Sequence, residues 1–459
     1  MRWLADNLAL VMFAAMFVVI FCGYPVAFVL GGTGLVFALI GWGLDRFELQ
    51  GLANILLRMW GGVAEDPILV SIPMFIFMGA ILERSGSARR MLEATQVLLR
   101  GVPGGLAVAV MVMGTILAAP IGVVGAAVVL LSIIALPQML AAGYDKRLAI
   151  GTIASAGTLG ILIPPAIMLV VMAEMLQTSA GALFAAATVP GLLLSGLYLL
   201  YILGVALVRP ARAPRPAADD GPRTRAEIWH TLWTGLAPMT FLMVVVLGSI
   251  FAGWATATES AGVGVFGAML IAAVNRRLTP AMLREAIRDA CRSNAMVFML
   301  FLGATGFSYV FRALGGDDAV LAALARLGVD TRWELLAFVM ALIFLLGFPL
   351  EWIEICLIVL PVFTPILARL DFSDHIGSSG YFMAWFATLV AVNLQTSFMT
   401  PPFGATLFYM KGTVPPGVTM SDVYRAMYPF VALQIAGLAL CIAFPGIVLW
   451  LPRVTGLLD

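Results

Sequence analysis

The stretch NLQTSFMTPPFG, residues 393–404, places polar side chains and two consecutive prolines inside a strongly apolar part of the chain. A proline inside a helix removes one N–H donor and clashes with the carbonyl one turn earlier, so two in succession end the helical geometry. In the hydrocarbon core of a membrane the freed backbone groups need partners, and such breaks persist where they line a cavity or lie buried within the protein. The stretch therefore predicts a broken membrane helix with a binding function.

The composition of the whole chain supports a membrane location. Of its 459 residues, 62% are hydrophobic and 11% are charged, and the mean hydropathy is +1.04. These values are typical of multi-pass membrane proteins rather than of soluble domains. Hydropathy indicates about eleven to thirteen apolar segments, several of them broken. The first apolar run leads directly into further membrane segments, so we expect no cleavable signal peptide.

Several classes of function are disfavoured by residues that the chain lacks. The net charge of +1 and the absence of a dense basic block argue against nucleic-acid binding. The four cysteines are scattered and only two histidines occur, so we expect no metal centre, no cofactor and no redox site. The chain contains no G-K-[ST] motif, which argues against a nucleotide-driven pump. The GSSG sequence at 377–380 resembles a protease nucleophile motif, but it lies in a polar loop, so we expect no enzyme activity.

A polar linker, residues 209–229, divides the chain into two halves that carry the same elements in the same order. The first half, 1–208, is expected to contain a charged surface helix at 85–100, a re-entrant hairpin at 118–140 and a broken helix at 148–175. The second half, 230–459, is expected to contain the corresponding elements at 279–292, 345–368 and 383–410, followed by a C-terminal helix at 430–452. Membrane sequences resemble one another because they use a restricted set of amino acids. Here three features recur in the same order, which favours a true repeat.

Charge at equivalent loops suggests that the repeat is inverted. GYDKR at 143–147 is net positive, whereas DFSDH at 371–375 is net acidic. The positive-inside rule places the first loop in the cytoplasm and the second outside. We therefore expect an all-α polytopic membrane protein in which the two charged surface helices lie flat at opposite membrane faces.

The polar residues around the two breaks are the candidate ion and substrate ligands. In the first half these are Ser155, Gly157, Thr158, Gly160, Pro164 and Pro165, and in the second half Asn393, Gln395, Thr396, Ser397, Thr400, Pro401, Pro402 and Gly404. Neutral oxygens from hydroxyls and unwound backbone are what transporters use to hold Na⁺. We predict Na⁺ ligands at Ser155, Thr158, Thr396 and Ser397. The alternative is that these hydroxyls only bond back to helix carbonyls.

Four acidic residues lie in apolar surroundings, where a carboxylate is a candidate functional group. Glu351 and Glu354 are three residues apart, and we expect them on one face of the second hairpin's first arm, facing a cation or a partner arginine. Glu259, in TATES, is either functional or a helix cap. Glu174 is expected at an interface.

Four stretches together resemble the large membrane subunit of tripartite ATP-independent periplasmic (TRAP) transporters, the DctM family. They are AGYDKRLAIGTIASAGTLGILIPPAI (142–167), TATESAGVGVFGA (256–268), GFPLEWIEICLIVLPVFTPIL (347–367) and NLQTSFMTPPFGATLFY (393–409). The resemblance runs from about residue 23 to the C-terminus. The form QTSFMTPPFG is most similar to the branch associated with 2-oxo acids, mannitol and chloroaromatic compounds.

The resemblance implies a Na⁺-driven elevator in the bacterial inner membrane that imports an organic acid. It also implies a small four-helix membrane subunit and a periplasmic substrate-binding protein as partners. The tip of the first hairpin, PIGVVGAA at 120–127, departs from a family pattern that is rich in serine, so a Na⁺ site there would rely on backbone carbonyls near Gly122 and Gly125. Glu351 stands where an aspartate is common. A passive channel, or a carrier that needs no binding protein, remains the alternative.

Overall fold

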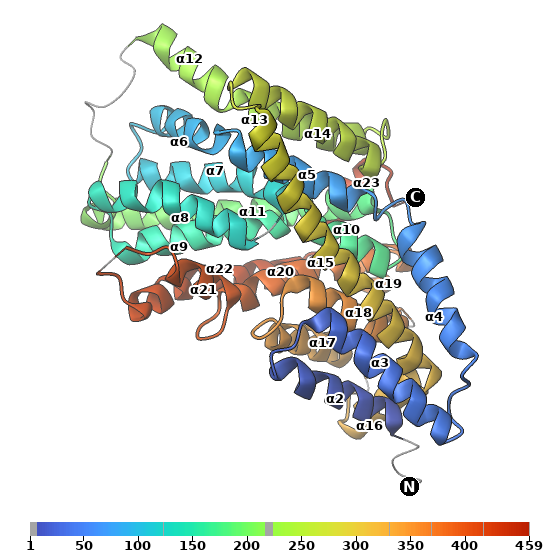
Figure 1. The fold of residues 1–459 in the computed structure, drawn as a ribbon. Coiled ribbons are helices and arrows are strands. Elements are labelled where there is room, and N and C mark those ends of the chain that lie inside the picture. The colour runs from blue at the N-terminus through green and yellow to red at the C-terminus, as the bar shows by residue number, and fades with distance from the viewer. Residues whose placement is uncertain are drawn as a thin grey trace.

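The computed structural model describes residues 7–122, 124–215, 224–329, 331–368, 370–415 and 417–458. The centre of the polar linker, 216–223, lies outside these residues. All regular elements within them are helices (Figure 1). Seven of these helices are long and apolar enough to cross a membrane, or eight if the bent pair α12 (Arg225–Gly235) and α13 (Ala237–Phe251) is one span. This is fewer than the apolar segments expected, because broken and short helices do not reach that length.

One group of helices, called here the outer helices, surrounds the centre on one side. It comprises α2 (Leu8–Phe21), α3 (Val26–Gly43), α4 (Gly51–Met59), α5 (Ser71–Arg84), α13, α14 (Ala257–Val274) and the long α15 (Pro280–Ala313). Helix α15 packs against both α3 and α5, and α14 packs against α5. A Cβ at Gly303 of α15 would lie only 2.3 Å from the Ala27 carbonyl oxygen of α3, so this close crossing requires glycine.

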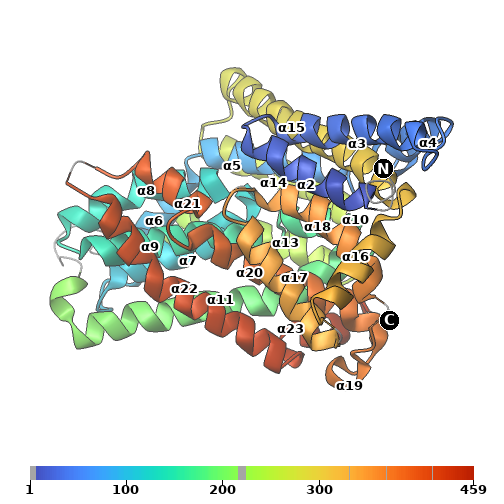
Figure 2. The same cartoon turned by 90° about the horizontal axis from the view of Figure 1, so that it is seen from below.

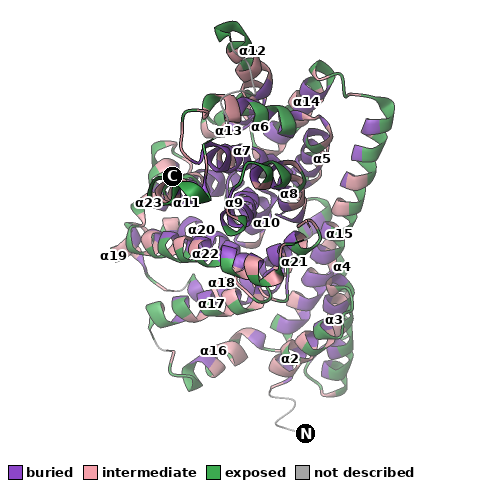
Figure 3. Cartoon of the chain, turned by 90° about the vertical axis from the view of Figure 1, so that its left-hand side faces the viewer, coloured by how far each residue is buried: buried purple, intermediate pink, exposed green. Residues whose placement is uncertain are grey.

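Eleven further helices of the described chain form a central bundle. Its members are α7 (Gly105–Ile121), α8 (Val124–Ala141), α9 (Lys146–Thr158), α10 (Ile167–Met175), α11 (Ala180–Val208), α17 (Arg332–Leu346), α18 (Trp352–Leu367), α20 (Phe382–Met399), α21 (Ala405–Lys411), α22 (Met420–Ala443) and α23 (Gly446–Val454). Helices α7, α9 and α10 are almost wholly buried (Figure 3). The two halves of the chain pack against each other: α8 packs against α21, and α18 packs against α10.

The two hairpins are longer than the sequence suggested. The turn of the first lies at Gly122, with a φ of +65°, between α7 and α8. The turn of the second, residues 347–351, joins α17 to α18. Val124–Ala141 is therefore one continuous helix, and the expected limits of 118–140 and 345–368 enclose little more than the second arm of each hairpin. The limits were wrong because they relied on the proline spacing, and the closing prolines of the two stretches, Pro137 and Pro365, lie inside helices.

The loops of opposite charge lie at opposite ends of α11, whose 29 residues span about 43 Å at ~1.5 Å per residue. At its C-terminal end, the Asp145 N–H donates to the Arg212 carbonyl at 2.9 Å. At its N-terminal end, Leu457 packs beside Gly181, and Arg453 of α23 donates to the Ile376 carbonyl at 2.5 Å. Figure 2 shows α8 and α9 at one end and α19 (Ser373–Ile376) at the other.

The acidic loop at 371–375 is partly neutralised. Both terminal guanidinium nitrogens of Arg332 donate to the Asp374 carboxylate, at 2.7 and 2.5 Å. These bonds lower the pKa of Asp374, which is otherwise exposed. The loop is therefore less negative than its own five residues indicate.

The prediction that the two charged surface helices lie at opposite faces is wrong. Asn275, just before α15, donates to Ser87 at the start of α6 (Ser87–Leu98), at 3.2 Å, and Arg84 pairs with Asp289 of α15. Both helices thus begin in one cluster, whereas opposite faces are about 30 Å apart. The reason is that α5 and α14, which precede them, end side by side. By position before a hairpin, α6 corresponds to α16 (Gly316–Arg326) instead.

Candidate functional site

The two chain breaks meet at the centre of the bundle. The Gln395 side-chain amide of α20 donates to the Thr158 carbonyl at the end of α9, at 3.0 Å and across 237 residues of sequence. The Thr158 hydroxyl oxygen lies 3.4 Å from the Met399 sulfur. Thr158, Gln395 and Met399 are at most 1% exposed. The structure therefore joins the two polar clusters into one buried region.

Each break follows from its double proline. Helix α9, capped by Asp145, ends at Thr158 and continues as a short turn, Leu159–Ile161, before Pro164 and Pro165. Helix α20 ends at Met399, before Pro401 and Pro402, and both Pro–Pro peptide bonds are cis. Residues 155–165 are buried throughout, Gly157 and Gly160 included, whereas Pro402 is exposed. The second break therefore reaches the surface of the chain, whereas the first does not.

The predicted hydroxyl ligands all donate to carbonyls of their own helices. At the first break, Ser155 donates to the Gly151 carbonyl at 2.8 Å and Thr158 donates to the Ser155 carbonyl at 3.0 Å. At the second break, Thr396 donates to the Val392 carbonyl at 3.2 Å and Ser397 donates to the Leu394 carbonyl at 2.9 Å. Thr400 donates to the Thr396 carbonyl at 2.6 Å. This is the geometry of the helix-packing alternative. A hydroxyl that donates one bond keeps its oxygen lone pairs, so it can still accept from a donor or bind a cation. The bonds fix where those lone pairs point.

Among the described residues near the breaks, two buried amide oxygens have no hydrogen-bond partner. They are Oε1 of Gln395 and Oε1 of Gln434, a residue of α22 whose amide nitrogen lies 3.2 Å from the Met399 sulfur. Buried polar atoms normally have partners, so an unsatisfied oxygen here is a candidate ligand. Gln434 was not among the residues expected from the sequence, although a single glutamine within the apolar run of α22 was the available signal. Asn393 instead donates to the Met340 carbonyl at 2.7 Å and holds α17 against α20.

The turns of both hairpins pack against residues that flank the two helix breaks. A Cβ at Gly122 would lie 2.7 Å from Ile167 at the start of α10, and a Cβ at Gly125 would lie 2.7 Å from the ring of Tyr409 in α21. At the second turn, a Cβ at Gly347 would lie 2.0 Å from the Ser397 hydroxyl oxygen. The breaks are thus enclosed by glycines that permit close approach of the hairpin backbone.

The acidic residues have specific partners. Glu351 accepts a hydrogen bond from the Tyr409 hydroxyl at 3.0 Å, and Glu354 accepts from the Glu351 N–H at 3.1 Å. They lie at the start of the hairpin's second arm, not on its first arm, and in the described chain neither forms a salt bridge with an arginine. Glu259 caps α14 together with Thr256, at 2.8 Å, which confirms the capping interpretation.

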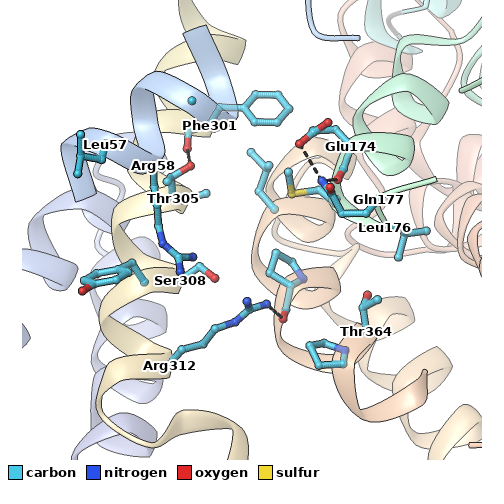
Figure 4. A pocket seen from close by; sticks show the side chains of 18 residues that line it. Leu57, Arg58, Glu174, Leu176, Gln177, Phe301, Thr305, Ser308, Arg312 and Thr364 are labelled. Atoms are coloured by element: carbon cyan, nitrogen blue, oxygen red, sulfur yellow. Dashed lines mark hydrogen bonds between the residues drawn. The ribbon is translucent and has the colours of Figure 1, made fainter. Parts of the chain in front are cut away.

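A cavity of about 580 Å³ separates the outer helices from the central bundle (Figure 4). Arg58 and Arg312 approach it from α4 and α15, and Glu174 lines it from α10. Arg312 donates across the gap to the Pro361 carbonyl of α18 at 2.8 Å. Arg58 lies over the Tyr309 ring, 5.1 Å from its centroid. Neither arginine was among the residues expected from the sequence, although Arg312 near the end of an apolar helix was a visible signal.

An all-helical chain whose broken helices meet between two hairpins has the architecture of a membrane transport protein. Residues 13–447 match the family model described as the tripartite ATP-independent periplasmic transporter, DctM component. The chain therefore belongs to this family, and the resemblance inferred from its motifs is confirmed.

Characterised relatives support the same assignment. The chain is 30% identical over 398 residues to the C4-dicarboxylate TRAP transporter large permease protein DctM of Pseudomonas aeruginosa, covering 86% of this chain and 88% of that one. It is 27% identical to the ectoine TRAP transporter large permease protein TeaC of Halomonas elongata, covering 96% and 98%. The Alcanivorax borkumensis YdaH transporter structure matches with a TM-score of 0.61 and 16% identity, over 89% of this chain and 90% of that one. That likeness concerns the fold alone.

Proposed function

We propose that this chain is the permease subunit of a Na⁺-coupled secondary transporter that imports an organic acid by an elevator mechanism. The observation that carries the proposal is the buried contact between the two breaks, from Gln395 to the Thr158 carbonyl. It concentrates helix ends, hydroxyls and unsatisfied amide oxygens at one point inside an apolar bundle. Broken helices that meet in this way are the usual site of ions and substrates in secondary transporters.

Sodium would bind where α9 and α20 end. The C-terminal ends of helices carry partial negative charge and free carbonyl oxygens, which favour a cation. Ser155 and Thr158 lie at the first end, and Thr396 and Ser397 at the second. The Gln395 side chain links the two ends through its amide nitrogen, and its unsatisfied oxygen would complete the set of ligands. All of these ligands are neutral, as expected for Na⁺.

The equivalent loops at 143–147 and 371–375 lie at opposite ends of α11, which supports an inverted repeat. The distribution of charge supports an orientation. The starts of α11 and α14 line one hollow together, through Ser179 and Thr256. The far end of α14, with the arginine-rich starts of α6 and α15, therefore lies toward the same side as Lys146 and Arg147. By the positive-inside rule this side is cytoplasmic, and we propose the inner membrane as the location.

The central bundle would be the mobile transport domain, and the outer helices its scaffold. The two groups meet across the cavity of Figure 4, where the hydrogen bond from Arg312 to Pro361 would break as the bundle slides. Two guanidinium groups against one carboxylate leave the cavity lining net positive. Such a lining suits an organic anion that enters from the periplasmic side.

The substrate class and the partners follow from the family. A tripartite periplasmic system has two further components, which we take to be a small four-helix membrane subunit and a periplasmic binding protein. Similarity to a C4-dicarboxylate permease supports a carboxylate, including a 2-oxo acid. Similarity to an ectoine permease means that relatedness alone does not select the branch.

We expect uptake into vesicles to require an inward Na⁺ gradient and the binding protein, but no ATP. The permease and the small subunit are reconstituted together, and labelled organic acid is added with its binding protein. Vesicles without binding protein serve as the control. Uptake that continues undiminished with Na⁺ absent from both sides would contradict coupling. Uptake that needs no binding protein would favour the independent carrier.

A further inference from the structure

A basic hollow lies where α5 and α14 end. It has a volume of about 480 Å³ and is lined by Arg89, Arg90 and Arg277, with Glu93 as its single acidic residue. In the described chain none of the three arginines forms a salt bridge, and Arg90 donates to the Asn275 side-chain oxygen at 2.5 Å. The hollow therefore holds excess positive charge with free guanidinium donors, which favours an anion able to bind arginine bidentately.

An apolar groove begins at the same place. It has a volume of about 320 Å³ and shares Asn275 with the basic hollow. Its walls are formed by Pro238, Phe241, Leu242 and Val245 of α13 and by Val263, Phe266, Gly267, Leu270, Ile271 and Val274 of α14. Phe241, Phe266 and Val274 are 69%, 69% and 70% exposed. The α14 wall extends for about 16 Å, close to half of a ~30 Å hydrocarbon core.

We propose that these two hollows bind one anionic phospholipid, with its phosphate among the arginines and an acyl chain in the groove. The positive charge of the basic hollow favours an anionic group. Because the apolar groove continues from this hollow, that group should be joined to an apolar chain that reaches through one leaflet. A partner helix fits less well, because a helix about 10 Å across would fill roughly 1,250 Å³ over this length. Basic pockets on the cytoplasmic side of membrane helices are typical sites for acidic headgroups. This proposal does not rest on the proposed transport function.

The test uses the permease purified with its small subunit and stripped of lipid. Phosphatidylglycerol, phosphatidylcholine or inorganic phosphate is added, and bound lipid is counted by native mass spectrometry while the melting temperature is followed. The variants are the double substitution Arg89→Gln with Arg277→Gln, and Leu270→Trp, which fills the groove. Arg288→Gln is the matched control, because Arg288 is exposed on α15 and does not line the hollow.

We expect wild type and Arg288→Gln to prefer phosphatidylglycerol over phosphatidylcholine. Each arginine near an anionic headgroup strengthens binding roughly fivefold, so the double variant should bind phosphatidylglycerol about 25-fold more weakly. Leu270→Trp should weaken binding of both lipids. Equal effects of the double variant and Arg288→Gln would overturn the proposal. A thermal shift with inorganic phosphate alone that equals the shift with phosphatidylglycerol would also overturn the proposal. Loss of the small subunit from the Leu270→Trp variant would overturn it as well, because the groove would then be a subunit interface.

Discussion

Replacement of Gly404 by alanine is expected to lower the initial rate of uptake about ten- to a hundredfold. A Cβ at Gly404 would lie 2.3 Å from the carbonyl oxygen and 2.7 Å from the carbonyl carbon of Phe398, and 3.1 Å from the Ser397 carbonyl oxygen. These are backbone atoms at the end of α20, so they cannot rotate away as a side chain can. Overlap of this kind costs about 1–3 kcal/mol and here would widen the second break itself.

The matched control is Gly412→Ala, at the end of the same short helix, α21. There the nearest atom to an added Cβ is 3.7 Å away, which is ordinary contact. Uptake by both variants is compared at equal amounts of protein in the vesicles. If Gly404→Ala assembles normally and transports as fast as Gly412→Ala, the geometry of the break does not matter for function.

Replacement of Thr396 by alanine is expected to raise the Na⁺ concentration needed for half-maximal uptake, roughly ten- to a hundredfold. Thr396 is 1% exposed and lies beside the break, where loss of a ligand or buried hydrogen bond costs about 1–3 kcal/mol. Ion and substrate are coupled through one mobile unit, so weaker Na⁺ binding should appear as a higher Na⁺ requirement. Saturating Na⁺ should restore much of the uptake.

Thr388→Ala separates ion binding from helix packing. Thr388 lies two turns earlier on α20, is equally buried and donates to the Ala384 carbonyl at 2.8 Å, just as Thr396 donates to Val392. We expect this variant to keep the wild-type Na⁺ dependence. If both variants respond to Na⁺ alike, the Thr396 hydroxyl serves packing and the ion lies elsewhere.

Features that depend on local backbone chemistry could be predicted from the sequence. Two adjacent prolines end a helix whatever surrounds them, so both breaks lie where the motifs placed them. The Thr256 and Glu259 pair needs only its own four residues to form a cap. The hairpin turns were harder, because the apolar arms before Gly122 and Gly347 look like ordinary membrane helices.

Features that depend on long-range packing could not be predicted. The contact from Gln395 to Thr158 joins residues that no local pattern relates. The shared cluster at the starts of α6 and α15 exists because α5 and α14 end side by side, which hydropathy cannot show. For the same reason Gln434 and Arg312 acquire partners only once α22 and α15 are packed against the bundle.

The most direct test of Na⁺-coupled transport is whether the reconstituted system accumulates its substrate above the external concentration. Vesicles holding the permease and small subunit receive labelled organic acid, binding protein and an inward Na⁺ gradient, and internal label is followed to steady state. We expect accumulation well above equilibrium, which collapses when a Na⁺ ionophore dissipates the gradient. A passive channel can only equalise the two concentrations. Internal label that stops at equality, with the same final level after ionophore, would contradict coupled transport.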